Sequence, residues 1–421
     1  MKRPQAGLVR ALWWALWLGV TALAGCGGGG GSGPVAAPAP TLTVPAAANA
    51  QALVVDSGPA EMTTAVVNVP YTSVKICVPN TNTCQVIDHV MVDTGSTGLR
   101  LLDASVSLPL PALNVAGGAL YNCVQFLDQT YMWGAVRSVD LHMGGDTLEG
   151  EAAASLPIQV VGAAGDPAAP AACAATGFVA KNTLNALGAR GILGVGSALQ
   201  DCGAACASNA GNGYYYARNT SGLVVGSTVS LGQQLQQPVS RFASDNNGVL
   251  IQLPAVAATG ASGANGSLVF GIGTQTNNQP AASVTVLTFN SQGNFSTHFN
   301  GRTLTRGFVD SGSNAYFFGG NFSPIYPLCS GGGGWYCPPS TQTLQATNTG
   351  ANGQTSVVQF SVVNASNAFG QAGVTAMGGL AAPIGDNASF DFGLPFFYGR
   401  QVYTAVQGAS TSLGVGPFVA Y

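Results

Sequence analysis

The sequence predicts a mainly β fold whose two halves each carry the same short turn around an aspartate. From residue 52 onwards, short runs rich in Val, Ile, Leu and Thr are interrupted by Gly, Asn and Pro, which is the pattern of strands joined by turns. No stretch with helical periodicity convincingly exceeds three turns. The chain has 421 residues, which is enough for two domains.

The first of the two turns lies within residues 90–102, which read VMVDTGSTGLRLL. Three apolar residues lead into Asp93, and the apolar pattern resumes after the turn. The turn itself consists of small residues: Thr94, Gly95 and Ser96. Glycine lets the backbone bend where a Cβ atom would clash. This stretch therefore predicts a strand, a tight turn that carries one carboxyl group, and a second strand.

The second turn lies within residues 307–318, which read GFVDSGSNAYFF. Here Asp310 is followed by Ser311, Gly312 and Ser313. The hydroxyl groups in both turns can hydrogen-bond a carboxylate or the backbone. If the two turns face each other, their carboxyl groups cannot both ionise at low cost, so they share a proton. One carboxyl group then serves as an acid and the other as a base.

A third sequence of this kind, Asp56-Ser57-Gly58, lacks the supporting features. Pro59 follows it, so no hydroxyl group stands at the fourth position. We expect an ordinary turn after the first strand there.

The two matched turns resemble those of the pepsin-like aspartic peptidases, which place one D-[ST]-G-[ST] turn in each of two similar β-rich lobes. The resemblance extends to the apolar segments that end in glycine after each aspartate and to two further strands: residues 191–196, 390–397, 266–271 and 398–406. It implies a bilobal pepsin-like acid protease fold, with two six-stranded-barrel-like lobes and a cleft between them. The lobes are expected at residues 52–245 and 246–421.

By this resemblance, the protein is an aspartic endopeptidase in which Asp93 and Asp310 activate a water molecule that attacks a peptide carbonyl. The resemblance implies that Thr94 and Ser311 brace the two turns against each other. It also implies that the hydroxyl groups of Ser96 and Ser313 bond the outer carboxylate oxygens, with Gly95 and Gly312 in the turns. The expected partner is a peptide or protein substrate in the cleft, bound by a monomer that needs no cofactor or metal. Activity is expected to be greatest at acidic pH.

Residues 121–145 resemble the flap hairpin that closes over the substrate in this family. The family uses a tyrosine there, so Tyr131 and Trp133 are the candidates, with Phe126 competing for the same register. An ordinary surface hairpin is the alternative. Arg100 departs from the family, whose members usually carry an aromatic residue that supports the flap at that position.

A second class of function remains open, a catalytically silent pepsin-like scaffold that acts as a binding module of the cell envelope. Both aspartates and all four supporting hydroxyl groups favour the enzyme. The altered surroundings of the flap and the unusual surface favour the binding module.

The N-terminus reads as a targeting segment. Basic residues are followed by an apolar run, residues 11–24, that is too short to span a bilayer comfortably. The run ends in LAGC, which resembles a bacterial lipoprotein cleavage site, with residues 1–25 as the signal peptide and Cys26 as the acylated residue. An ordinary secretory signal is the alternative. Residues 26–51, rich in Gly, Pro and Ala, are expected to form a flexible tether. The expected location is the bacterial cell envelope, lipid-anchored at the outer membrane, with the periplasmic or surface face left open.

The composition excludes several other functions. Only 7% of the residues are charged, so the clustered Lys and Arg of a nucleic-acid-binding protein are absent from the sequence. The chain has only three histidines, too few to suggest a His-rich metal site.

Eight cysteines besides Cys26 form an even set, which in an exported chain predicts disulfides. Short loops suggest the pairs Cys77–Cys84, Cys202–Cys206 and Cys329–Cys337, which leaves Cys123–Cys173. The last pair would tie the flap region to the body of the first lobe. A metal site is the alternative.

Overall fold

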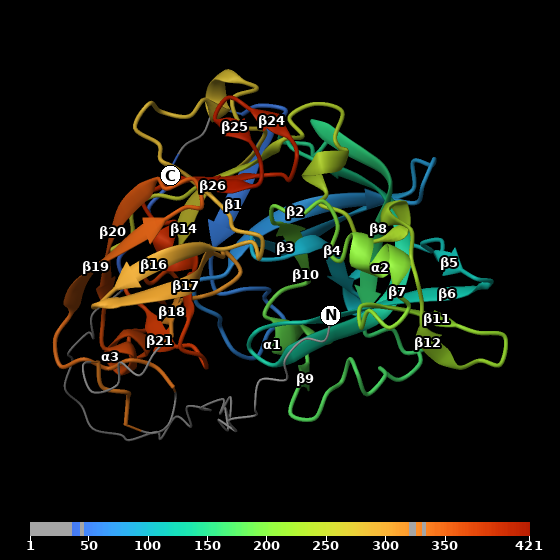
Figure 1. The fold of residues 1–421 in the computed structure, drawn as a ribbon, viewed down its shortest axis with the longest axis horizontal. Helices are drawn as coiled ribbons and strands as arrows, with labels where there is room; N and C mark the ends of the chain where they lie inside the picture. The colour runs from blue at the N-terminus through green and yellow to red at the C-terminus, as the bar shows by residue number, and fades with distance from the viewer. Residues whose placement is uncertain (1–35, 43–45, 320–325, 331–333) are drawn as a thin grey trace, which may run out of the picture.

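The computed structural model describes residues 36–42, 46–319, 326–330 and 334–421. Strands make up 41% of it and helices 8%, which confirms the prediction of a mainly β fold. Among the described residues, the strands form sheets of 17, seven and two strands. Figure 1 shows the first half of the chain on the right, the second half on the left, and strands of both halves meeting across the top.

The first half closes into a six-stranded barrel. Its strands pair in the cyclic order β2 (Pro70–Cys77), β3 (Cys84–Asp93), β10 (Gly191–Val195), β4 (Thr97–Leu102), β8 (Glu151–Val161), β7 (Thr130–Met143) and back to β2. The pairs β3–β10 and β4–β8 are parallel, and β4 and β10 are buried along their whole length, as is typical of strands covered on both faces. Strand β3 of the barrel ends at Asp93, so the barrel leads directly into the first aspartate turn.

The second half forms an open half-barrel rather than the second six-stranded barrel that the sequence predicted. Its strand order is β20 (Thr355–Val362), β19 (Gln342–Thr349), β16 (Phe295–Phe299), β17 (Arg302–Val309), β22 (Ser389–Phe392), β18 (Tyr316–Phe318) and β21 (Ala381–Pro383). The edge strands β20 and β21 do not pair with each other, so this sheet does not close. A group of fully buried phenylalanines fills its inner face: Phe295, Phe318, Phe390, Phe392 and Phe396.

Strand pairing joins the two halves. Six strands follow each other in the order β1 (Ala50–Val55), β14 (Ala264–Phe270), β13 (Gly248–Gln252), β23 (Gln401–Ala405), β26 (Phe418–Ala420) and β15 (Val286–Thr288). β1 also pairs with β2 of the barrel. Strand β1, which precedes the first aspartate, is thus held between β14 of the second half and β2 of the first. The expected lobe boundary at residues 245 and 246 falls just before β13.

The remaining elements are short. The strands are β5 (Asn114–Val115), β6 (Gly118–Gln125), β9 (Val179–Ala180), β11 (Tyr215–Arg218), β12 (Val224–Gly226), β24 (Ser410–Thr411) and β25 (Gly414–Val415). The helices are α1 (Leu184–Leu187), α2 (Ala204–Ser208) and α3 (Ala365–Phe369), with 3₁₀ turns η1 (Asp103–Ser105), η2 (Leu231–Gln233), η3 (Val239–Arg241), η4 (Thr276–Asn278) and η5 (Leu394–Phe396). Within the described residues, no helix is long and apolar enough to cross a membrane.

Part of the expected tether lies against the body of the protein. The amide of Leu42 donates to the carbonyl of Asn265 at 2.8 Å, and β1 already begins at Ala50. Composition predicted a tether as far as residue 51, but these residues complete a sheet edge that would otherwise be unpaired. The signal peptide of residues 1–25 and the acylation site at Cys26 lie outside the described residues.

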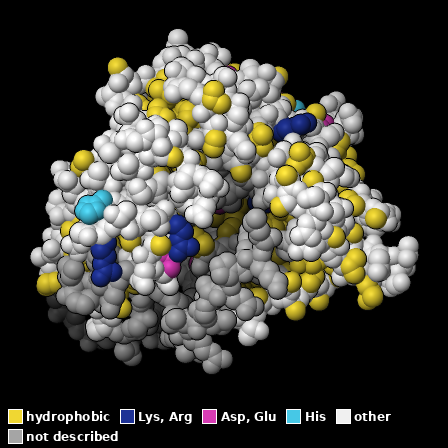
Figure 2. All heavy atoms as spheres, in the orientation of Figure 1, with side chains coloured by type: hydrophobic (Ala, Val, Ile, Leu, Met, Phe, Trp, Pro, Cys, Tyr) yellow, Lys and Arg dark blue, Asp and Glu magenta, His cyan; other side chains and the backbone are white. Residues whose placement is uncertain are grey.

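The surface carries little charge. The face in Figure 2 is mostly covered by uncharged polar and apolar side chains, with only scattered Lys, Arg and acidic groups. This agrees with the 7% of charged residues in the sequence.

All four predicted disulfides are present: Cys77–Cys84, Cys123–Cys173, Cys202–Cys206 and Cys329–Cys337. Four disulfides indicate an extracellular or envelope location, since the cytosol keeps thiols reduced. Free-thiol titration of the denatured protein lacking Cys26 should therefore find none.

The bond that closes the longest loop should contribute most to stability. Cys123 and Cys173 are 50 positions apart, and Cys202 and Cys206 only 4. Chain-entropy arguments give a loss of about 4 kcal/mol for the first bond and about 2 kcal/mol for the second. We expect the Cys123→Ser/Cys173→Ser variant to unfold at clearly lower denaturant concentration than the Cys202→Ser/Cys206→Ser variant. Equal midpoints would contradict this.

Candidate active site

The two aspartate turns face each other and are joined by crossed hydrogen bonds. The amide of Thr94 donates to Oγ of Ser311 at 3.1 Å, and the amide of Ser311 donates to Oγ1 of Thr94 at 3.0 Å. Each hydroxyl group then donates across to the opposite strand, Thr94 to the carbonyl of Val309 and Ser311 to that of Val92. The structure thus places Thr94 and Ser311 as the resemblance implied, with each turn held by the other.

Each carboxyl group lies against the glycine of the opposite turn. A Cβ atom on Gly95 would lie 2.6 Å from Cγ of Asp310, and one on Gly312 would lie 2.8 Å from Cγ of Asp93. Only glycine allows such an approach at both places. Two turns from distant parts of the chain therefore bring two carboxyl groups together at the junction of the halves.

Backbone amides orient both carboxyl groups. The amide of Gly95 donates to Oδ1 of Asp93 at 2.7 Å, and the amide of Gly312 donates to Oδ1 of Asp310 at 2.8 Å. The hydroxyl group of Ser313 donates to Oδ2 of Asp310 at 2.9 Å, as expected.

The hydroxyl group of Ser96 does not make the corresponding bond in the first turn. Its Oγ is buried without a hydrogen-bond partner among the described residues, and only its amide reaches Oδ1 of Asp93, at 3.2 Å. A Cβ atom on Gly194 would lie 2.8 Å from this hydroxyl oxygen, so it is packed against β10 instead. The two turns are therefore matched in their backbone but not in their outer hydroxyl groups.

The pair of carboxyl groups is strongly coupled. Burial raises the pKa of Asp310 well above its ordinary value, and Asp93, as a like charge and hydrogen-bond partner, raises it further. Two acids in contact can hold a single proton between them. Chemically, this arrangement can supply a base and an acid at the same place.

The segments behind the two turns match as well. β10 runs parallel to β3, with Gly194 beside Asp93, and β22 runs parallel to β17, with the amide of Asp310 donating to the carbonyl of Phe392. The two apolar segments singled out in the sequence thus support the two aspartates in equivalent ways.

The expected flap hairpin exists but is held on several sides. β6 and β7 pair around a turn at Asp128, β11 pairs along the outer edge of β6, and Cys123 of β6 is bonded to Cys173. Thr130 at the tip pairs with Val179 of β9. These contacts tie the hairpin to β11, to β9 and to the segment that carries Cys173.

The aromatic candidates of this hairpin pack against a neighbouring loop. Tyr131 and Trp133 line a cavity of about 220 Å³ with the loop of Asp166 and Pro167, and Nε1 of Trp133 donates to the carbonyl of Pro167 at 2.8 Å. Their placement fits the alternative of an ordinary hairpin. Phe126 packs instead against the apolar cluster that contains Ile192 of β10.

Arg100 belongs to a buried polar network that sequence reasoning did not foresee. Its guanidinium lies 3.3 Å from Oδ2 of Asp201, which also accepts from Asn122 at 3.0 Å, while Tyr215 donates to Oδ1 at 2.6 Å. Burial raises the pKa of Asp201 to about 6, opposed by Arg100, Tyr215 and Asn122. Arg100 therefore contacts the segment that carries Asp201 and β11, and does not support a flap.

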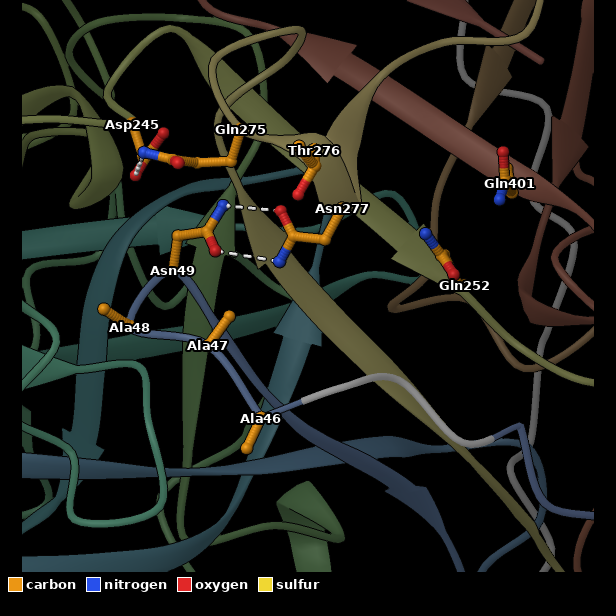
Figure 3. Close-up of a pocket in the computed structure, with 10 residues that line it drawn as sticks. All are labelled: Ala46, Ala47, Ala48, Asn49, Asp245, Gln252, Gln275, Thr276, Asn277 and Gln401. Carbon is orange, nitrogen blue, oxygen red and sulfur yellow. Dashed lines mark hydrogen bonds between the residues drawn. The ribbon is translucent and has the colours of Figure 1, made fainter.

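One open cavity is lined by residues other than the carboxyl pair. It has a volume of about 550 Å³ and lies between the start of β1, Asp245 and η4. Figure 3 shows that Asn49 and Asn277 exchange two amide hydrogen bonds there, at 3.1 and 2.9 Å, so these groups satisfy each other. Neither this cavity nor any cluster of His, Cys, Asp and Glu in the described ranges offers a metal site.

A family model described as "Protein of unknown function (DUF3443)" matches residues 45–421, which include both aspartate turns and both halves of the fold. No curated protein matches the sequence. Because the family model covers nearly all of the described chain, the protein belongs to the DUF3443 family.

Proposed function

We propose that the protein is an aspartic endopeptidase of pepsin-like type, with Asp93 and Asp310 as its catalytic pair. The observation that carries this proposal is the crossed contact of the two turns, in which each carboxyl group lies on the glycine of the opposite turn. A purely structural role does not explain why two buried acids are held side by side, because burying like charges is costly.

The reaction follows from the shared proton. The ionised carboxyl group accepts a proton from a water molecule, whose oxygen attacks the peptide carbonyl carbon. The protonated carboxyl group gives its proton to the carbonyl oxygen, which yields a tetrahedral diol. Collapse of the diol breaks the C–N bond: one diol hydroxyl group gives its proton to the ionised carboxyl group, while the amine leaves with the proton of the other carboxyl group. The products are a carboxylic acid and an amine, and the pair returns to its singly protonated form.

The shape of the molecule is consistent with a substrate between the halves. The face in Figure 2 is hollowed between the right-hand and left-hand parts. Few charged side chains are available to line such a groove. We therefore expect a peptide or protein substrate with hydrophobic residues on both sides of the scissile bond, bound by a monomer without a cofactor.

The proposed location is the bacterial cell envelope, where acylated Cys26 anchors the mature chain in the outer membrane. The four disulfides support an oxidising compartment. The lipoprotein-like sequence at residues 23–26 supports the anchor.

The test is digestion of casein and of an unbiased peptide library between pH 3 and pH 8, with and without pepstatin. Cleavage at acidic pH that pepstatin blocks is the expected result. Strong selection for Lys or Arg beside the cleaved bond would contradict the expected substrate class. A folded, disulfide-intact protein that cleaves nothing over this range would end the peptidase proposal.

The fixed hairpin favours a second candidate, a pepsin-like binding module that has no turnover. β11, the Cys123–Cys173 bond and β9 all restrain the element that closes over substrate in active relatives. A binding module would keep its ligand affinity when Asp93 or Asp310 is replaced by Asn, whereas the peptidase would lose turnover.

A further inference from the structure

A third carboxyl group, that of Asp391, lies beside the candidate pair. The parallel pairing of β17 with β22 places Asp391 next to Phe308. Because strand side chains alternate between faces, Phe308 and Asp310 lie on one face, and Asp391 shares it. Phe390 and Phe392 point to the opposite face, into the phenylalanine core.

The first half has no counterpart to this acid. There β10 pairs with β3 in the same parallel manner, which places Ile192 next to Met91, two residues before Asp93. The equivalent position is thus an apolar residue in one half and an aspartate in the other. A carboxyl group at that position is not needed to build the strand pair.

Asp391 is enclosed and incompletely bonded. Its side chain belongs to a residue that is only 4% exposed, and its Oδ1 is buried without a hydrogen-bond partner in the described structure. Ser313, whose hydroxyl group donates to Oδ2 of Asp310 at 2.9 Å, lies near enough to Asp391 to lower its pKa. Its neighbours across the sheet, Phe308 and Phe317, are apolar.

We propose that Asp391 is a third acidic group of the candidate site, which keeps the Asp93–Asp310 pair singly protonated at higher pH than the pair alone could. It acts on the pair and not on a substrate, and is therefore a positioning residue.

The direction of this effect follows from electrostatics. A negative charge on Asp391 disfavours a second negative charge on the nearby pair, so it raises the pH at which the pair loses its last proton. The titratable groups that act on Asp391 are Asp310 and, more weakly, Asp93. Burial is the main cause that raises the pKa of Asp391 well above its ordinary value, and the charge of Asp310 adds to it.

The first test is independent of catalysis. An acid whose folded pKa is raised contributes stability that is fully present below its unfolded pKa of about 4 and is lost as the pH rises through the folded pKa. Asp391→Asn keeps the volume and cannot ionise. We expect its melting temperature, relative to that of the wild type, to rise by about 2–4 °C between pH 4 and pH 8.

A difference in melting temperature that stays constant over this range would overturn the proposal, since it would mean that the pKa of Asp391 is not raised in the folded protein. Asp146→Asn is the matched control, because Asp146 is exposed in the turn between β7 and β8. It should give no pH-dependent difference. Asp391→Leu is the second neutral variant if the buried Asn does not fold, since the equivalent Ile192 shows that an apolar side chain suits this position.

The second test uses activity and so rests on the proposed function. In Asp391→Asn, the midpoint of the alkaline limb of the pH profile for cleavage should move to lower pH by about one unit. At a given pH on that limb, this is about a tenfold loss of activity. An unchanged limb would contradict the proposal. If the wild type cleaves nothing at any pH, the proposed function fails, while the melting experiment still shows whether Asp391 is an acid with a raised pKa in the folded protein.

Discussion

Asp93→Asn and Asp310→Asn should each abolish peptide cleavage while leaving the protein folded. Either change removes the shared-proton state, because an amide can neither accept the proton from water nor return it. Residues that act as a unit are not additive, so either variant should lose nearly all turnover and the double variant little more. Asn keeps the side-chain volume and can still accept from the amides of Gly95 and Gly312.

The measurement is the cleavage rate at the acidic optimum, with circular dichroism as the test of folding. Asp56→Asn is the matched control, since Asp56 also stands in an Asp-Ser-Gly sequence. Its Oδ1 accepts from the amide of Gly58 at 2.8 Å, and its Oδ2 lies 3.3 Å from Nε2 of His89, in a turn after β1. That variant should keep its activity. Full activity in either variant of the pair would refute the catalytic assignment.

Gly95→Ala should reduce cleavage by about a hundredfold with a modest effect on the backbone. The added methyl group would lie 2.6 Å from Cγ of Asp310 and 2.8 Å from both of its carboxylate oxygens, so the carboxyl group must move. Gly95 is not among the glycines with positive φ, so alanine is allowed there by its backbone conformation. The loss of activity should therefore come from the displaced carboxyl group of Asp310 and not from strain in the backbone of Gly95.

Kinetics and a structure of the variant together check this prediction. Gly165→Ala is the control, because a methyl group there meets open space and its φ is not positive. Gly312→Ala should act on Asp93 in the same way, since its methyl group would lie 2.8 Å from that Cγ. Unchanged kinetics in both turn variants would mean that the two carboxyl groups do not work in the geometry described here.

Sequence reasoning found the features that depend on neighbouring residues. The two aspartate turns could be found because strand, small-residue turn and strand are all local, and their juxtaposition followed from the pattern occurring twice. Three disulfides followed from short loops, and the fourth, Cys123–Cys173, from what remained.

Features that depend on long-range packing were missed. Composition could not show that residues near Leu42 complete a sheet edge, because Asn265, their partner, is far away in the chain. The buried network of Arg100 and Asp201 was equally hidden. One signal for Asp391 was available, a charged residue between the two phenylalanines Phe390 and Phe392. The unpartnered hydroxyl group of Ser96 shows that matched sequences need not give matched hydrogen bonds.

The sparse charge of the surface has a consequence for how the protein meets its partners. The formal net charge is −3 over 421 residues, and the face in Figure 2 carries only scattered ionic groups. No extended electrostatic potential then guides an approaching molecule, so encounter proceeds at the basal diffusional rate, with association rate constants of about 10⁵–10⁶ M⁻¹s⁻¹. Because few charges attract or repel the partner, added salt should change the association rate little. Selection among partners is left to shape and to apolar contact after collision, which makes the protein tolerant of the changing ionic strength outside a cell.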